Sequence, residues 1–174
     1  EHLALFFRGH PKGGRTPAGV NVFPIQIGIA EQIPHAVGVA WGMKLRGADT
    51  AAVAMFGDGA TSEGAFHEAA NFAGVFKAPV VLFCQNNGWA ISQPAEPYLL
   101  APVADRAAGY GVPGVSVDGN DLESVRLAVG AAVARAREGA GPTLIEARTW
   151  RWRGHWAGDS QAYRRRPEPD DVED

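Results

Sequence analysis

The stretch AAVAMFGDGATSEG, residues 51–64, decides the fold. Residues 51–56 form a short, wholly apolar run, which predicts a buried strand of the kind found in parallel sheets. The turn Gly57-Asp58-Gly59 ends this run, and residues 62–76 then follow a helical pattern with Ser62 as a candidate N-cap. A strand, a glycine turn and a helix in succession predict a ligand-binding loop, because α/β sheets bind ligands outside the carboxyl ends of their strands.

The same alternation of strand and helix continues along the chain. Further strands are expected at residues 79–84, 115–117 and 143–147, and further helices at 30–46 and 122–138. This order predicts the α/β class, with a parallel sheet flanked by helices.

The last helix has the clearest boundaries. Asn120 is its candidate N-cap, Glu123 completes a capping box and Gly139 ends it. Its buried stripe is expected at Val125, Val129, Ala132, Val133 and Ala136, and that of the first helix at Ile33, Val37, Ala40, Trp41 and Leu45.

Length and composition exclude several classes of protein. The 174 residues suffice for one domain with a real core, and we expect a single domain over residues 1–174. A net charge of -3 gives no indication of nucleic acid, and no apolar run reaches the ~18–20 residues of a membrane span. The single cysteine, Cys84, excludes an intrachain disulfide and favours a reducing, cytoplasmic compartment. Because the chain begins at Glu1 rather than Met, we expect a fragment of a longer subunit.

The C-terminal part, residues 148–174, differs in kind from the rest. Residues 148–166 carry six Arg, three Trp and one Tyr, and an acidic tail follows from Glu168 to Asp174. One interpretation is a solvated loop with arginine stems packed on aromatic rings. The other is an active-site or partner-binding loop, because loops on such a scaffold usually carry the chemistry.

Asp58 lies between two glycines, where it would repel a bare phosphate. Its position makes sense with a divalent cation between carboxylate and phosphates, as Mg²⁺ is often held. Gln85-Asn86-Asn87 directly follows the next predicted strand and offers an amide oxygen, with a backbone carbonyl two residues on. Alone, the glycine turn is equally typical of a tight strand–helix connection. The Asn pair alone is more typical of a simple turn. A dinucleotide-binding fingerprint is a weaker interpretation, because Ser62 stands where the third glycine belongs.

Taken together, the two phrases resemble the thiamine diphosphate motif. More specifically, residues 57–68 (GDGATSEGAFHE) and 85–92 (QNNGWAIS) resemble the α subunit of the first component of 2-oxo acid dehydrogenase complexes. The resemblance extends to residues 21–24 (NVFP), 31–38 (EQIPHAVG), 117–121 (VDGND), 142–146 (PTLIE) and 153–155 (RGH), so that it covers nearly the whole chain.

The resemblance implies roles for individual residues. Asp58 and Asn87 would bind Mg²⁺ through their side chains, and Trp89 through its carbonyl. His155 matches the histidine of the family's active-site loop and is the catalytic candidate. Ile27 and Ile29 would contact the cofactor beside its thiazolium ring. Gly57, Gly59 and Ala60 would line its diphosphate. Gln85, where some relatives have an arginine, and His155 would also contact the cofactor.

The implied fold is the thiamine diphosphate-binding fold, in its diphosphate-binding domain. The implied activity is oxidative decarboxylation of a 2-oxo acid with acyl transfer to a lipoyl group, using thiamine diphosphate and Mg²⁺. The implied partners are a β subunit, in an assembly of two α and two β chains, and the lipoyl-bearing second component. Residues 21–29 favour pyruvate as substrate, whereas residues 154–159 also resemble acetoin dehydrogenase, and a branched-chain 2-oxo acid is a further alternative. Trp156 stands where some relatives carry a kinase-modified serine.

Two hypotheses of other classes remain. A non-catalytic assembly subunit would keep the fold without the chemistry, but intact Asp58, Asn87 and His155 argue against it. A nicotinamide-dependent enzyme would need the third glycine that Ser62 replaces.

Overall fold

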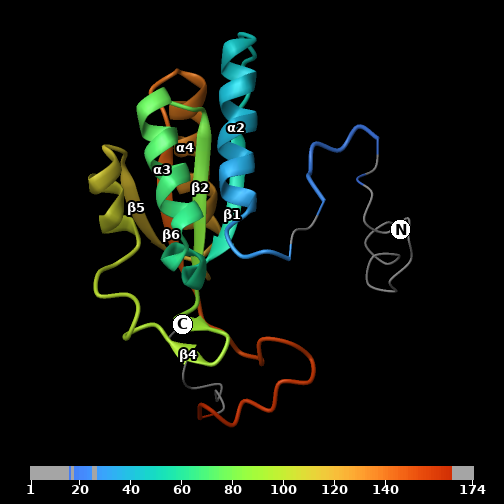
Figure 1. Cartoon of the computed structure of the whole chain (residues 1–174), viewed down its shortest axis with the longest axis vertical. Helices are drawn as coiled ribbons and strands as arrows, with labels where there is room; N and C mark the ends of the chain where they lie inside the picture. Colours follow the sequence, from blue (N-terminus) through green and yellow to red (C-terminus); the bar gives the residue numbers. More distant parts are fainter. Residues whose placement is uncertain (1–15, 17, 25–26, 166–174) are drawn as a thin grey trace.

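The computed structural model describes residues 16, 18–24 and 27–165. Its centre is a four-stranded sheet in the order β1-β2-β6-β5, made of β1 (Ala52–Gly57), β2 (Val80–Asn86), β6 (Thr143–Arg148) and β5 (Gly114–Asp118). All pairings in it are parallel, and the carboxyl ends of the strands lie together at the bottom of Figure 1. The predicted α/β class with a parallel sheet is therefore confirmed, and the four predicted strands lie within two residues of their expected bounds.

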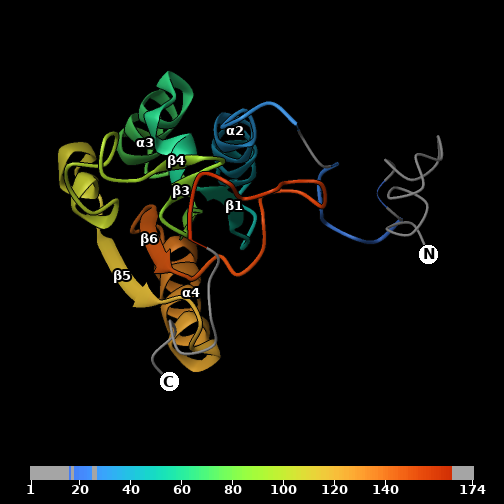
Figure 2. The same cartoon turned by 90° about the horizontal axis from the view of Figure 1, so that it is seen from below.

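Helices cover both faces of this sheet (Figure 2). α2 (Gln32–Leu45) and α3 (Gly64–Phe76) lie on one face, and α4 (Leu122–Arg137) lies on the other. None of the described helices is long and apolar enough to span a bilayer.

β2 separates two hydrophobic clusters, which explains its uninterrupted apolar sequence. Val80, Leu82 and Cys84 belong to the cluster under α2 and α3, whereas Val81 and Phe83 belong to the cluster under α4. Successive side chains of a strand point to opposite faces, so a strand covered on both sides must be apolar at every position.

β1 lies at the edge of the sheet and is covered on one face. Ala54 and Phe56 are buried in the α2–α3 cluster, but Val53 and Met55 alternate with them and remain 46% and 62% exposed.

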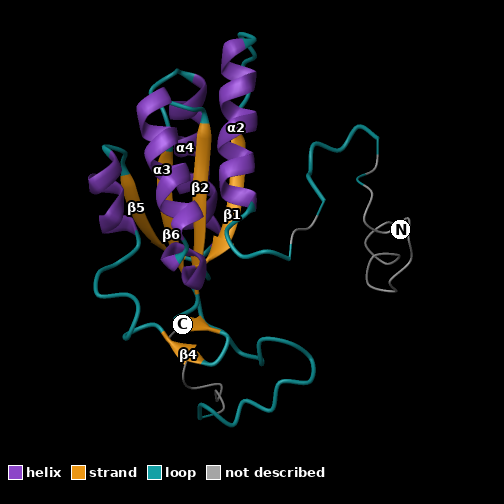
Figure 3. Cartoon of the chain, in the orientation of Figure 1, coloured by secondary structure: helices purple, strands orange, loops and turns teal. Residues whose placement is uncertain are grey.

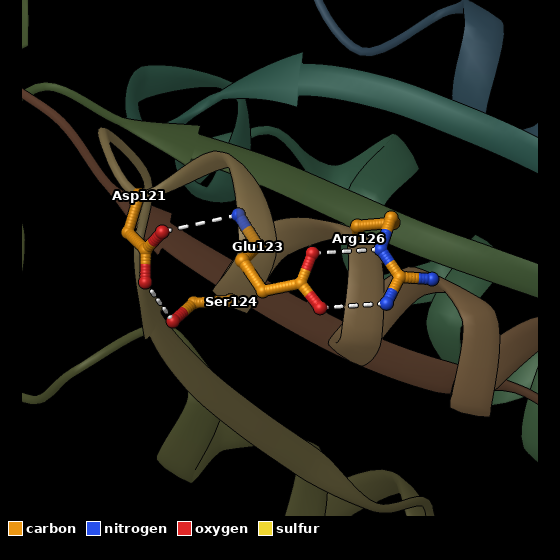
Figure 4. A network of polar contacts seen from close by, with 4 residues as sticks. All are labelled: Asp121, Glu123, Ser124 and Arg126. Atoms are coloured by element: carbon orange, nitrogen blue, oxygen red, sulfur yellow. Dashed lines mark hydrogen bonds and ion pairs between the residues drawn. The ribbon is translucent and has the colours of Figure 1, made fainter.

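α4 begins at Leu122, as predicted, but its N-cap lies one residue later than predicted (Figure 4). The N-cap is Asp121 rather than Asn120, because Asp121 Oδ1 accepts from the Glu123 amide at 3.0 Å and Oδ2 accepts from the Ser124 hydroxyl. The predicted capping box is wrong, since the Glu123 carboxylate binds Arg126 instead. The predicted end is confirmed: Gly139 has φ +78° and donates to Ala136 O.

Two other helix predictions need correction. Ser62 does not cap α3, because it belongs to a short 3-10 helix, η1 (Asp58–Ser62), and α3 begins at Gly64. Leu45 is 71% exposed rather than buried, because it lies about 120° around the helix axis from Ile33. Trp41 is half-exposed and stacks on Phe76 of α3, with ring centroids 4.4 Å apart.

The carboxyl end of the sheet carries structure that the sequence pattern did not predict (Figure 3). A small antiparallel pair, β3 (Trp89–Ala90) and β4 (Gln93–Pro94), follows β2 there. A second 3-10 helix that was also not predicted, η2 (Ala104–Tyr110), leads into the amino end of β5. The loop after β6, residues 149–165, lies at this same end, whereas the acidic tail lies outside the described residues.

Candidate functional site

The strand ends of β1 and β2 bring the two sequence motifs together. Gly57 and Gln85 are register partners in the parallel pair, so Asp58 and Asn87 both follow adjacent carboxyl ends. The backbone amide of Asn87 donates to Asp58 Oδ1 at 3.2 Å, across 29 residues of sequence. The predicted convergence of these two residues is therefore present in the structure.

Asp58 is only 1% exposed, and both its carboxylate and its backbone carbonyl accept hydrogen bonds. Besides the Asn87 amide, the Tyr98 hydroxyl donates to Oδ2, and the Thr61 hydroxyl donates to the backbone carbonyl of Asp58 at 2.7 Å. Burial and the hydrogen bond to Asp58 raise the pKa of Tyr98 well above its usual range, so Tyr98 remains a hydroxyl donor. Each carboxylate oxygen has a second lone pair, so Asp58 keeps acceptor capacity for a cation.

The Asn86–Trp89 segment forms two overlapping turns. Asn86 Oδ1 accepts from the Gly88 amide at 2.9 Å, and Asn87 Oδ1 accepts from the Trp89 amide at 3.0 Å. Gly88 has φ +74°, a conformation that favours glycine. The turn interpretation of the Asn pair is thus confirmed, and the backbone amide of Asn87 within this turn contacts Asp58.

The two glycines of the 57–59 turn have different surroundings. A Cβ on Gly59 would lie 2.9 Å from the Ala90 Cβ, so packing requires glycine there. A Cβ on Gly57 would meet nothing within 4 Å, and Gly57 is exposed. The backbone of Gly57 is therefore open to a ligand, while Ala60 is buried behind it.

Ile27 and Ile29 lie in the segment that leads into α2, and they are 94% and 60% exposed. α2 begins beside the end of β1, because Gln32 Nε2 donates to Met55 O at 2.9 Å. The structure therefore places this segment at the same end of the sheet as Asp58, with apolar side chains facing away from the described core.

The C-terminal loop packs on Trp89 through cation–π contacts. The guanidinium carbons of Arg151 and Arg164 lie 5.4 Å and 5.7 Å from the Trp89 ring centroid, and the Tyr163 ring lies 5.6 Å away. Arg151 also donates to Ile91 O and to the Tyr163 hydroxyl. The expectation of arginine stems packed on aromatic rings is confirmed for these residues.

Asp159 organises the tip of this loop. Its Oδ2 accepts from the Tyr163 hydroxyl and the His155 amide, and its Oδ1 accepts from the Gln161 amide. These hydrogen bonds, led by that from Tyr163, lower the pKa of Asp159 to about 2.

His155 is held by its backbone, not by its ring. Its side chain is exposed, and within residues 27–165 the imidazole makes no hydrogen bond to Asp58, Gly57 or Asn87. The structure thus shows no hydrogen bond that links the imidazole of the predicted catalytic histidine to these three described residues.

Three residues with polar roles at the site were not predicted: Tyr98, Arg106 and Glu146. Arg106 of η2 donates to Thr61 O and Oγ1 at 3.1 and 3.2 Å, which ties η2 to the turn after Asp58. Glu146 is 2% exposed on β6 and binds Asn86 Nδ2 at 2.7 Å. A charged residue inside the apolar run of residues 143–147 is a signal that could have identified Glu146.

The donor set at the site consists of oxygens. Among the described residues, no group of three or more His, Cys, Asp or Glu side chains is placed to hold a metal ion. The candidate ligands here are instead one carboxylate, one amide and one backbone carbonyl, a set that suits a hard cation such as Mg²⁺. Burial, followed by the nearby Asp58 and Glu146 carboxylates, raises the pKa of the Cys84 thiol far above its usual value, which makes it a poor metal ligand.

The helix-covered parallel sheet, with polar groups converging at two adjacent strand ends, defines an α/β ligand-binding domain. The profile of the family described as "Dehydrogenase E1 component" matches residues 8–174. The chain therefore belongs to the dehydrogenase E1 component family, as the sequence resemblance predicted.

Curated relatives agree with this assignment. The chain is 46% identical over 171 residues to the 3-methyl-2-oxobutanoate dehydrogenase subunit alpha of Mycobacterium tuberculosis (strain CDC 1551 / Oshkosh), covering 97% of this chain and 47% of that protein. It is 48% identical over 157 residues to the pyruvate dehydrogenase E1 component subunit alpha of Bacillus cereus, covering 89% and 42%. The chain thus spans about half the length of the curated relatives it matches.

Solved structures share the fold. An enzyme from Mycobacterium smegmatis described as thiamin diphosphate-dependent aligns with a TM-score of 0.53 and 27% identity, over 71% of this chain and 23% of that one. A transketolase from Pichia stipitis aligns with a TM-score of 0.54 and 24% identity, over 70% and 19%, and supports the fold alone.

Proposed function

We propose that this chain is the diphosphate-binding domain of the α subunit of a thiamine diphosphate-dependent 2-oxo acid dehydrogenase. The observation that carries the proposal is the contact between Asp58 and the Asn87 amide at adjacent strand ends. Family membership and the names of the relatives support it, and the Mycobacterium smegmatis neighbour supports the cofactor class.

The residues present fit a cation and a diphosphate. Asp58, Asn87 and the Trp89 carbonyl would hold Mg²⁺, because they supply only oxygen ligands. Gly57, Gly59 and Ala60 would line the diphosphate, supported by the open space in front of Gly57. The exposed side chain of Gln85 lies at the end of β2 and would reach the same group.

The cofactor, when bound, supplies an electron sink for decarboxylation. The chain's own residues orient it and limit its contact with water. Ile27 and Ile29 would present an apolar surface beside the reacting ring, which agrees with their exposure in this chain. His155 would donate a hydrogen bond to a phosphate or a developing oxyanion, as an imidazole can near neutral pH.

The proposed partners follow from the relatives' names and from the incomplete site. A β subunit would cover the exposed side of the cofactor in an assembly of two α and two β chains, and a lipoyl-bearing second component would accept the acyl group. We expect this assembly in the cytoplasm, with which the single free thiol of Cys84 is compatible.

Pyruvate is the proposed substrate, supported by the relatives from Bacillus cereus and Staphylococcus aureus. A branched-chain 2-oxo acid is the second candidate, because the Mycobacterium tuberculosis relative is named for 3-methyl-2-oxobutanoate. Acetoin is the third candidate.

The first test is calorimetry of thiamine diphosphate binding to the full-length subunit with its β partner. Wild-type assembly should bind the cofactor only in the presence of Mg²⁺, and Asp58→Ala should abolish this Mg²⁺-dependent binding. A panel of pyruvate, 3-methyl-2-oxobutanoate and acetoin then ranks the substrates. Absence of binding in the assembled wild type would favour the non-catalytic assembly subunit instead.

A further inference from the structure

Glu146 is a buried carboxylate to which the proposed function assigns no role. It lies in β6 and is 2% exposed. Its Oε1 accepts from Asn86 Nδ2 at 2.7 Å, and its Oε2 accepts from the Ala104 amide at 3.0 Å. Both donors are neutral amides, and burying a carboxylate costs free energy that such bonds offset only in good geometry. An apolar residue would fill this strand position at lower cost, so the carboxylate calls for a specific reason.

The reason lies in what Glu146 does to Asn86. A carboxylate only accepts hydrogen bonds, so Asn86 must turn its NH₂ group toward Glu146. The amide oxygen of Asn86 is then left to accept from the Gly88 amide, at 2.9 Å. The orientation of the Asn86 amide is thus set by Glu146, and the turn that follows is closed by that orientation.

The same turn carries the candidate cation ligands. Asn87 and Trp89 lie within it, and its position is also fixed by the bond from the Thr149 amide to Asn86 O at 2.7 Å. The backbone amide of Asn87 contacts Asp58, so a displaced turn would move Asn87 away from Asp58. Mutation of a group that orients a metal ligand without touching the metal commonly lowers metal affinity by about 10–100-fold.

We infer that Glu146 is a positioning residue for the cation site, acting through the side chain of Asn86. This inference rests on the proposed function, since the cation is part of it. Glu146 touches neither cation nor cofactor; it holds the turn that presents Asn87 and Trp89.

The test exploits the direction of the hydrogen bond. Glu146→Gln keeps the shape of the side chain but replaces one acceptor by a donor, which must face either Asn86 Nδ2 or the Ala104 amide. In the double variant Glu146→Gln with Asn86→Asp, the amide at position 146 donates to the carboxylate at position 86. The hydrogen bond is thereby restored in the opposite direction, and the negative charge lies at position 86. The readout is Mn²⁺ affinity by electron paramagnetic resonance, with thiamine diphosphate present and the full-length subunit assembled with its β partner.

Glu146→Gln should weaken Mn²⁺ binding by about 10–100-fold, and the double exchange should recover most of the loss. Thr143→Val is the matched control, because Thr143 is a buried polar residue at the other end of β6 and should leave Mn²⁺ affinity unchanged. Melting of each cation-free assembly shows whether a variant is folded at the assay temperature.

Wild-type Mn²⁺ affinity in Glu146→Gln would overturn the inference, as would a loss that the double exchange leaves unrecovered. If Glu146→Gln does not assemble, Asn86→Ala carries the test, and unchanged affinity in that variant would also overturn it. A wild-type assembly that binds no Mn²⁺ would instead refute the proposed function, and the inference with it. The two failures are therefore distinguishable.

Discussion

Gly57 and Gly59 have the same side chain but are required for different reasons. Gly59 is close to Ala90, so its lack of a Cβ serves packing, whereas Gly57 has open space in front of it. Gly57 has φ -87° and ψ 167°, which any residue adopts, so its backbone conformation does not require glycine. We therefore propose that glycine stands at position 57 to allow close approach by a ligand.

We predict that Gly57→Ala folds normally but binds the cofactor poorly. Its free energy of unfolding should stay within about 0.5 kcal/mol of wild type, since the new methyl group meets no atom. Affinity for thiamine diphosphate in the assembled enzyme should fall by about tenfold, the equivalent of one weakened hydrogen bond to a charged group. Urea unfolding and calorimetry measure the two quantities.

Gly59→Ala is the matched contrast and should fail at the level of folding. The Cβ would lie 2.9 Å from Ala90, and relieving that contact should cost about 1–3 kcal/mol of stability. If both variants lost stability equally, or if Gly57→Ala bound the cofactor as wild type does, the assignment of Gly57 to ligand approach would be wrong.

Individual residues of the site were predictable where they follow strand ends. Asp58 and Asn87 each come directly after a strand that begins with an apolar run, and parallel strands bring their carboxyl ends to one edge. Tyr98 and Glu146 reach the site through contacts 40 and 60 residues apart in sequence, to Asp58 and Asn86. The Tyr98 contact depends on how the loop after β4 folds back, and the Glu146 contact depends on the pairing of β2 with β6, so the local sequence does not identify either partner.

At the scale of the element, α4 shows how far local rules go. The apolar stripe and Gly139 located the helix, but two adjacent residues, Asn120 and Asp121, are both good N-caps. The structure selects Asp121, while the amide of Asn120 donates to Asp118 Oδ1. Only the path of the chain out of β5 distinguishes them, which the sequence pattern does not contain.

We predict that Asp121→Ala lowers the melting temperature and Asn120→Ala does not. Loss of the Asp121 cap leaves the Glu123 amide and the Ser124 hydroxyl without their acceptor. The expected decrease is about 2–4 °C for a chain of this size. Thermal unfolding by circular dichroism decides between them, and an equal decrease in both variants would contradict the assignment of the cap.

The loop after β6 should depend on the ionisation of Asp159. The pKa of Asp159 is lowered to about 2, so its stabilising contribution is complete above its usual pKa of 3.8 and is lost as pH falls toward 2. Amide protection of His155 and Gln161, measured by hydrogen exchange, should therefore be constant at neutral pH and decrease between pH 4 and 2.

Asp159→Asn should lower that protection already at neutral pH, because one of the two acceptor oxygens becomes a donor. Ser160→Ala is the matched control and should behave as wild type, since the Ser160 hydroxyl makes only a long contact of 3.5 Å to the Ala162 amide. Protection that is insensitive both to pH and to Asp159→Asn would show that the cation–π contacts of Trp89 order the loop without Asp159.

For the whole molecule, alternating strands and helices predicted the parallel sheet but not its strand order. β6 lies between β2 and β5, although it comes last in sequence, and its side chains enter the hydrophobic clusters on both faces. β1 has the same apolar character but lies at the edge, with Val53 and Met55 exposed. Composition alone therefore did not tell which strand is central.

The described residues do not enclose the candidate site. A cavity of about 360 Å³ lies at the opposite end of the sheet, lined by residues that include Lys44, Asp49 and Arg137. At the carboxyl end, Gly57, Ile27 and Ile29 face solvent. Ligand sites normally bury 70–90% of a small molecule, so a cofactor bound here needs cover from elsewhere.

We therefore predict that the 174-residue chain alone binds no thiamine diphosphate, whereas the full-length subunit assembled with its β partner does. The physical reason is that an open edge gives cation and diphosphate contacts without burying the apolar ring, and water competes for every one of those contacts. Calorimetry of both preparations at equal Mg²⁺ tests this directly, and circular dichroism establishes that the chain alone is folded. Binding of equal affinity in the two preparations would show that this chain holds the complete site, and the β subunit would then have to serve a purpose other than covering the cofactor.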